Sequence, residues 1–202
     1  MDSQTRRTVL FDADDRIARI TLNRCGALNA VDAEMGAELR SAWSRGAADP
    51  GLVGVILIGA GGEAFSLGID RSPGTMPAPA DSLLSPRLDV PLVVAVNGMA
   101  CAEALELIRA ADTVVAAEHA RFFPVWPLSS SSGGAPVHAA EAVATGLVDT
   151  VVPLVWLRDE AEKAVRWLAG KDNAPARAKG AVPGDDGVWR STRAAARRPP
   201  AG

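Results

Sequence analysis

The residues best suited to chemistry lie in one stretch, Val90 to Asp112, which has the sequence VPLVVAVNGMACAEALELIRAAD. Glu103 and Glu106 stand three residues apart where helical spacing begins, so they would lie on neighbouring helical faces. The first N–H groups of a helix have no intrahelical partner and suit an anion or a developing oxyanion. Acids in a first turn are also ordinary partners of the helix dipole. The stretch therefore predicts either a site for an anion or a developing oxyanion, with two carboxylates nearby, or an ordinary helix start.

These residues need a rigid element in front of them, and the sequence supplies one. Leu92 to Asn97 is a short apolar run rich in β-branched residues, which favours a strand buried on both faces. Asn97-Gly98 is a turn signal, and helical periodicity follows from Ala100. Val53 to Ile58 and Thr113 to Ala117 are two further apolar runs that predict buried strands.

The remaining elements are predicted from shorter patterns. Arg6 to Leu10 and Ile17 to Leu22 are expected to pair around the polar turn Asp12 to Asp15, and a helix is expected to start at Val31-Asp32. We expect Phe122 to Trp126 to be irregular. The proline-rich segment from Ser72 to Pro91 predicts a mobile surface loop that can cover a site. Further predicted elements are a helix at Glu141 to Thr145, a strand at Val148 to Val152 and an amphipathic helix at Arg158 to Leu168.

Strands that alternate with helices predict an α/β fold with mostly parallel sheets and crossover helices. Ligands in such folds bind at the carboxyl ends of the strands. Two loops qualify, Gly59 to Asp70 after the strand VGVILI and Asn97 to Glu103 after LVVAVN. We expect residues 1–169 to form the core domain and residues 170–202 to form a polar C-terminal tail, partly disordered.

Composition narrows the classes of partner. The 202-residue chain has a net charge of −3 and no basic patch interleaved with aromatic residues, so we expect no nucleic-acid ligand. Its two cysteines, Cys25 and Cys101, are far apart and its two histidines stand outside any cluster, so we expect no metal site. No apolar run reaches membrane-spanning length. These features predict a cytoplasmic protein without a membrane partner.

Five segments, in order along the chain, resemble the crotonase (enoyl-CoA hydratase/isomerase) family. They are ARITLNRCGALNAV, VGVILIGAGGEAFSLGID, VPLVVAVNGMACAEALELIRAAD, AEHARFFPVWP and EAVATGLVDTVVP. The resemblance implies a spiral ββα superhelix that assembles as a homotrimer or a dimer of trimers, with residues 170–202 as a possible trimerisation segment. It also implies an acyl-CoA thioester as the partner, with coenzyme A as part of the substrate and no bound cofactor.

The resemblance assigns roles residue by residue. The backbone N–H groups of Ile69 and Glu103 match the two donors that polarise the thioester carbonyl, and Glu106 matches the first catalytic carboxylate. Gly68 precedes the first donor, and Asp70 matches a recurrent acid after it. Ala27, Leu28 and Ala64 match positions that contact the adenine and pantetheine of coenzyme A. Trp126 stands where the second catalytic carboxylate is found.

Two departures from the family pattern leave the function open. The family's glycine triplet is Ala102-Glu103-Ala104 here, and the Glu103 side chain can fold away, block the site or place a carboxylate beside the thioester. Trp126 replaces an acid that hydration needs. The first hypothesis is an acyl-CoA-processing enzyme that stabilises a thioester enolate for hydration, isomerisation or decarboxylation. The alternative is a non-catalytic acyl-CoA-binding or assembly protein with a degenerate active site.

Overall fold

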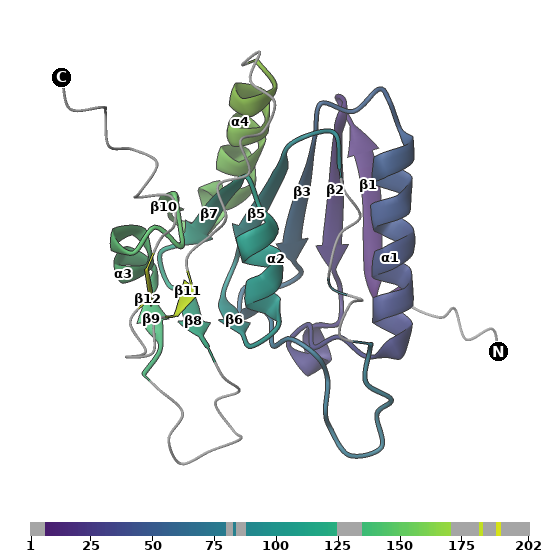
Figure 1. Cartoon of the computed structure of the whole chain (residues 1–202), viewed down its shortest axis with the longest axis vertical. Helices are drawn as coiled ribbons and strands as arrows, with labels where there is room; N and C mark the ends of the chain where they lie inside the picture. The colour runs from purple at the N-terminus through teal and green to yellow at the C-terminus, as the bar shows by residue number, and fades with distance from the viewer. Residues whose placement is uncertain are drawn as a thin grey trace.

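The computed structural model describes residues 7–79, 83, 88–124, 135–170, 182–183 and 189–190, the last four by their backbone alone. Two sheets carry the fold, and helices cover the larger one (Figure 1). Its strand order is β1-β2-β3-β5-β7-β10, with β1 and β2 antiparallel and every other pair parallel. The strands are β1 Val9–Asp14, β2 Ile17–Leu22, β3 Gly54–Gly59, β5 Leu92–Val96, β7 Thr113–Ala117 and β10 Thr150–Val152.

The central strands of this sheet are buried on both faces, as their continuous apolar runs predict. Alternate residues of β3 enter different cores: Val55 and Leu57 join one cluster, and Ile56 and Ile58 join the other. The first cluster includes residues of helices α1 (Ala33–Ala48) and α2 (Ala104–Ala110), whereas the second includes Leu157, Ala161 and Val165 of α4 (Leu157–Ala169). Helices α1 and α2 therefore cover one face of the sheet and α4 covers the other.

Helix α1 begins where the sequence predicts. Asp32 is its N-cap, and the Asp32 carboxylate accepts a hydrogen bond of 2.8 Å from the Met35 N–H. This contact satisfies one of the free N–H groups of the first turn and is typically worth about 1 kcal/mol. Met35, Leu39 and Trp43 lie on the buried face at four-residue spacing. The cap fixes the end of the helix that lies beside the loop from Arg24 to Asn29.

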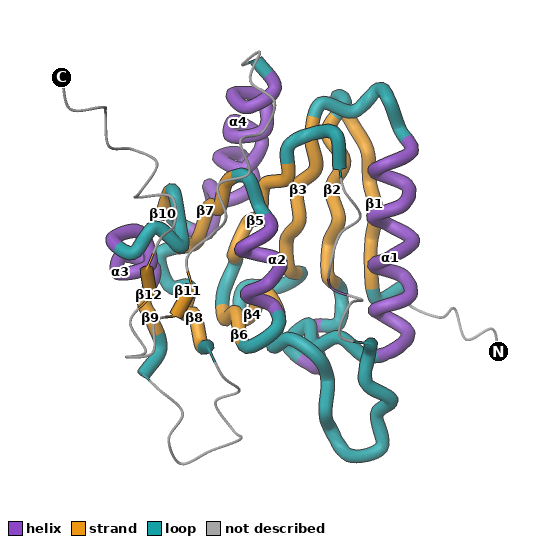
Figure 2. Tube along the Cα trace, in the orientation of Figure 1, coloured by secondary structure: helices purple, strands orange, loops and turns teal. Residues whose placement is uncertain are grey.

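A second, smaller sheet forms at the edge where β3 and β5 end (Figure 2). Its strands have the order β4-β6-β8-β9 and comprise β4 Ala64–Ser66, β6 Met99–Cys101, β8 Arg121–Phe123 and β9 Val137–His138. Strand β4 begins a few residues after β3 ends, and β6 begins a few residues after β5 ends. The two sheets therefore bring together the loops that follow those strands. The remaining elements are α3 Ala139–Ala144 and the 3-10 turns Cys25–Ala27 and Leu154–Trp156.

Three sequence-based expectations are wrong in detail. Strand β1 runs to Asp14, and the turn is only Asp15-Arg16, both with positive φ, which gives a two-residue hairpin whose twist matches its strands. Phe122 to Phe123 lies in β8 instead of an irregular segment. Helix α2 starts at Ala104, later than Ala100, because Met99–Cys101 first pairs in the second sheet.

The proline-rich segment is anchored more firmly than a mobile loop. Ala78, Leu83 and Leu88 are buried members of the main core. The Met76 carbonyl accepts a hydrogen bond of 3.0 Å from the Ala33 N–H at the start of α1. In the proposed tail, residues beyond Gly170 lie outside the described chain except for a short antiparallel pair, β11 Val182–Pro183 with β12 Trp189–Arg190.

Candidate functional site

The first loop of the site holds the Ile69 amide in a fixed direction. The Val31 N–H donates to the Gly68 carbonyl at 2.8 Å, and the Asp70 N–H donates to the Val31 carbonyl at 2.9 Å. The Gly68 N–H donates to the buried Ser66 hydroxyl at 3.1 Å. With the polar groups on either side engaged inside the protein, the Ile69 N–H is the one that faces the second loop.

Gly68 allows the two loops to meet. Its φ is +85°, and a Cβ built there would lie 2.6 Å from Glu103 Oε2 and 3.1 Å from the Glu103 backbone nitrogen. Any side chain would collide with this neighbour and would also require a left-handed backbone. Glycine at this position is therefore needed for the Ile69 and Glu103 amides to approach each other.

The second loop makes a sharp turn between β6 and α2. The Ala102 N–H donates to the Phe123 carbonyl at 2.9 Å, and Ala102 has φ +48°. Helix α2 follows, with the Leu105 N–H donating to Ala102 and the Glu106 N–H to Glu103. A left-handed alanine costs roughly 1–2 kcal/mol, so the surrounding contacts impose this turn on a residue that does not favour it.

The Glu103 side chain folds back onto these amides. Glu103 Oε2 accepts a hydrogen bond of 3.2 Å from the Ile69 N–H. Burial raises the pKa of the Glu103 carboxyl, but hydrogen bonds from Arg71, from the Glu103 amide itself and from the Ile69 amide outweigh it, so the pKa lies below its ordinary value. The Ile69 amide, one of the two predicted carbonyl donors, is thus bound to the protein's own carboxylate, and the backbone nitrogen of the second, Glu103, lies close to the same loop at Gly68.

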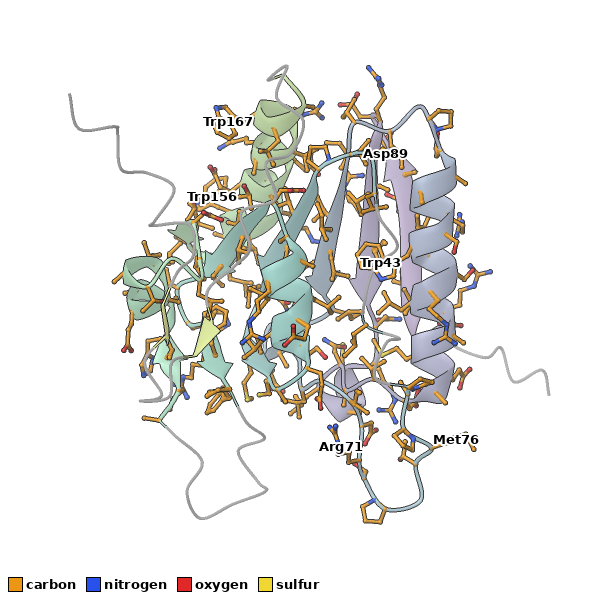
Figure 3. All side chains as sticks on the ribbon, in the orientation of Figure 1. Trp43, Arg71, Met76, Asp89, Trp156 and Trp167 are labelled. Carbon is orange, nitrogen blue, oxygen red and sulfur yellow. The ribbon has the colours of Figure 1, made fainter. Side chains whose placement is uncertain are left out.

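Arg71 completes the carboxylate's surroundings. Its guanidinium donates to both carboxylate oxygens of Glu103, in the two-pronged geometry that favours arginine, and also to the Ile69 carbonyl at 3.3 Å. The Glu103 side chain is 28% exposed and that of Arg71 is 54% exposed. Arg71 lies on the loop that extends below the sheet (Figure 3). Sequence analysis missed Arg71, because only the fold places it opposite Glu103.

The predicted acid Glu106 lies one turn further along α2. Its carboxylate pairs with Arg109 on the same helix, and its side chain is half exposed at 51%. An exposed pair three residues apart on a helix contributes only a few tenths of a kcal/mol, so it holds the carboxylate weakly. Glu106 is free to exchange this partner for another.

Two buried asparagines, neither of them predicted as a site residue, hold the loop after β3. Asn97 accepts from the Gly59 N–H at 3.0 Å and donates to the carbonyls of Gly61 and Ala64. Asn29 donates to the carbonyls of Ala60 and Ala64. These contacts satisfy backbone groups at the end of β3, at the start of β4 and between them, so they fix the path from β3 to Ile69. The signal in the sequence was the apolar context of each asparagine.

Arg24 joins three parts of the site. Its guanidinium contacts Asp70 at 2.5 Å and Asp32 at 3.2 Å, and it donates to the Ala30 carbonyl. Asp70 is buried, and burial raises the pKa of its carboxyl. Hydrogen bonds from Ser72 and the Arg24 charge outweigh burial, so the pKa is held below its ordinary value. Asp70 is thus placed as a structural anchor directly after Ile69, turned toward Arg24.

The predicted coenzyme A contacts lie in different surroundings. Ala27 and Leu28 are half-buried and pack beside Leu67, Cys101 and Ala102, close to both loops. Ala64 is 2% exposed, and its carbonyl is taken by the two asparagines. Trp126 lies outside the described residues. The structure therefore brings Ala27, Leu28, Gly68, Ile69 and Glu103 into one neighbourhood.

Two further points about the described residues concern metal-binding clusters and helices that could cross a membrane. Within the described residues, no group of three or more His, Cys, Asp and Glu side chains is placed to hold a metal ion. Among the helices described, none is both long and apolar enough to cross a bilayer.

Comparison of the sequence with known proteins identifies a family and several relatives that this chain resembles. The sequence model of the family described as Enoyl-CoA hydratase/isomerase matches residues 12–125. The enoyl-CoA hydratase EchA19 of Mycobacterium tuberculosis is 32% identical over 66% of this chain and 64% of its own length. The (E)-benzylidenesuccinyl-CoA hydratase of Thauera aromatica is 32% identical over 56% of this chain. This chain spans only 48% of that relative's length.

Solved structures agree. The enoyl-CoA hydratase of Mycobacterium avium superposes with a TM-score of 0.70 at 30% identity, covering 84% of each chain. A carnitinyl-CoA dehydratase from the same species gives 0.70 at 28% identity, covering 84% of this chain and 77% of its own. The crotonase-like α/β fold predicted from the sequence is confirmed.

Proposed function

Because the chain belongs to the enoyl-CoA hydratase/isomerase family, we propose that it binds an acyl-CoA thioester and stabilises its enolate. The observation that carries this proposal is that Glu103 Oε2 accepts a hydrogen bond from the Ile69 amide, while the Glu103 backbone nitrogen lies beside the same residue, Gly68. Donors already aimed at an oxyanion are among the larger contributions to catalysis. A thioester oxygen in the place of Glu103 Oε2 would meet the same donors.

The remaining roles are taken from the family resemblance and belong to the same proposal. Glu106 transfers a proton to or from the acyl chain after leaving Arg109, and Ala27 and Leu28 contact the coenzyme A. The reaction is a hydration, a double-bond isomerisation or a decarboxylation, and coenzyme A is present only as part of the substrate. The proposed setting is cytoplasmic, and the proposed assembly is a homotrimer or a dimer of trimers.

A second candidate function has its own support. In the amide pair, which is the backbone N–H groups of Ile69 and Glu103, the Ile69 N–H is bound by the Glu103 carboxylate, and Glu106 is engaged with Arg109. Both observations favour a protein that binds an acyl-CoA without turning it over. In that case coenzyme A contacts supply the affinity and the amide pair remains closed.

The purified protein incubated with crotonyl-CoA separates a hydratase from a binding protein. A hydratase should consume the enone absorbance, and Glu106→Gln should reduce the rate by about 10²–10⁴-fold, the usual contribution of a general acid or base. The matched control is Glu160→Gln on α4, on the opposite face of the sheet, which should leave the rate unchanged.

The same samples report binding. Ligand at about 100 times its Kd should add about 2.7 kcal/mol to the unfolding free energy and raise the melting temperature. Stabilisation without turnover of crotonyl-CoA would exclude hydration and support the binding protein. Neither turnover nor stabilisation with crotonyl-CoA, butyryl-CoA or coenzyme A would contradict both candidates.

A further inference from the structure

The Glu103 carboxylate lies where a ligand would have to bind. It accepts from the Ile69 amide at 3.2 Å, and its Oε2 lies 2.6 Å from the position that a Gly68 Cβ would take. We infer that Glu103 is a built-in competitor of the thioester oxygen, and that an acyl-CoA can bind through its carbonyl only after this side chain has moved away. This inference rests on the proposed function and adds a regulatory contact to it.

The competition favours the state in which the Glu103 carboxylate is bound to the Ile69 amide, which we call the closed site. A carboxylate makes charge-assisted hydrogen bonds, which are roughly twice as strong as those of a neutral carbonyl oxygen. Glu103 is also tethered to the site, so it binds without the loss of translational freedom that a separate ligand incurs. A thioester carbonyl therefore has to displace a stronger and permanently attached acceptor.

Arg71 holds the competitor in place and also allows it to leave. Its two-pronged contact fixes both carboxylate oxygens of Glu103. Arg71 is more exposed than Glu103 and belongs to a loop, so the ion pair can swing toward solvent together without leaving a buried charge behind. Gly68 and Ile69 stay where they are, because Val31 and Ser66 hold the first loop. The Glu103 backbone stays as well, because Ala102 donates to Phe123 and Glu106 donates to Glu103 in the second loop.

The test compares two ligands on wild-type protein and Glu103→Ala by calorimetry. Butyryl-CoA has the thioester carbonyl, whereas coenzyme A shares every other group of the carrier and lacks the carbonyl. If the closed form makes up about 90% of the molecules, its removal should tighten butyryl-CoA binding about tenfold. The affinity for coenzyme A should change by less than about twofold, because the amide pair does not contact it.

A second measurement follows the Ile69 amide directly, first without ligand and then with it. The Ile69 amide proton, observed in ¹⁵N–¹H spectra, should lose its charge-assisted shift in Glu103→Ala and regain a large shift when butyryl-CoA is added. Arg71→Met should have an intermediate effect on both measurements, because it loosens the carboxylate without removing it. Glu160→Ala removes a carboxylate of similar exposure, paired with Lys163 on α4, and should behave as wild type.

The outcomes separate this inference from the proposed function. An unchanged Ile69 amide in Glu103→Ala, or an equal gain for both ligands, would overturn the competition while acyl-CoA binding stands. If neither ligand binds any of the variants, acyl-CoA binding itself is wrong and the competition falls with it. If Glu103→Ala does not fold, Glu103→Gln serves instead, with a smaller gain expected because its amide oxygen still accepts a hydrogen bond.

Discussion

At the scale of single residues, ion pairs and backbone hydrogen bonds hold the site together. Asp70 shows this well, since it follows Ile69 directly and its side chain is only 2% exposed. It is turned inward to Arg24, which also contacts Asp32 at the start of α1. One buried carboxylate therefore connects the amide loop to the nearest helix.

The Asp70 contact makes a pH-dependent prediction. Asp70→Asn should cost about 2–3 kcal/mol at pH 7, somewhat less than a fully buried pair because Arg24 is 24% exposed. The folded-state pKa of Asp70 is below the ordinary 3.8, so its stabilisation is present above that value and is lost as pH falls through the folded pKa. Urea unfolding between pH 7 and pH 2 should show the wild-type advantage shrinking only at the acid end.

The control for this prediction is an exposed aspartate. Asp12 contacts Arg19 at 3.4 Å and is 72% exposed, so Asp12→Asn should change the unfolding free energy by less than about 0.5 kcal/mol. A wild-type advantage over Asp70→Asn that grows as the pH falls would contradict the structure.

At the scale of elements, the length of a strand decides whether the sequence predicts it. The strands at 54–59, 92–96 and 113–117 are apolar runs of five or six residues, and the sequence predicts each within about a residue. Strands β4, β6 and β8 are three residues long, which is too short for a period to be recognised. Their pairing depends on where β3 and β5 end, so it is a property of the fold and not of the local sequence.

The turn between β6 and α2 gives an element-scale prediction. Ala102→Gly should leave the protein as stable or up to about 1 kcal/mol more stable, because relief of the left-handed φ exceeds the added freedom of glycine in the unfolded chain. Ala104→Gly, at the buried start of α2, should instead cost about 1 kcal/mol or more. Thermal unfolding of the two variants should move in different directions, and equal losses would contradict the observed turn.

At the scale of the whole molecule, the sequence predicts the fold and the family but not the state of the site. Five ordered segments identify the family, and buried strands followed by turns indicate which loops meet. The position of the Glu103 side chain depends on Arg71, which lies 32 residues earlier in the chain. Ion pairs across the fold show the same limit: Glu162 and Arg166 have helical spacing, yet they contact Arg19 and Asp15 respectively.

The packing of α4 on the sheet gives a prediction at this scale. A Cβ at Gly54 of β3 would lie 2.5 Å from Val165 Cγ1. Helix α4 can therefore pack this close to the strand only because Gly54 has no side chain. Gly54→Ala should cost about 1–3 kcal/mol from overpacking. Added to Val165→Ala, it should cost much less, because the shortened side chain makes room. Denaturant unfolding of the two single variants and the double variant measures this coupling, and strictly additive losses would contradict the contact.

Ala102 already holds the backbone as a glycine would, and only the side chain of the next residue closes the amide pair. Both glutamate codons become glycine codons by one change at the middle base. The closed arrangement is therefore a single point mutation away from an open one, with no other part of the loop needing to be rebuilt. A lineage carrying this chain can lose or regain access to these amides in one genetic step.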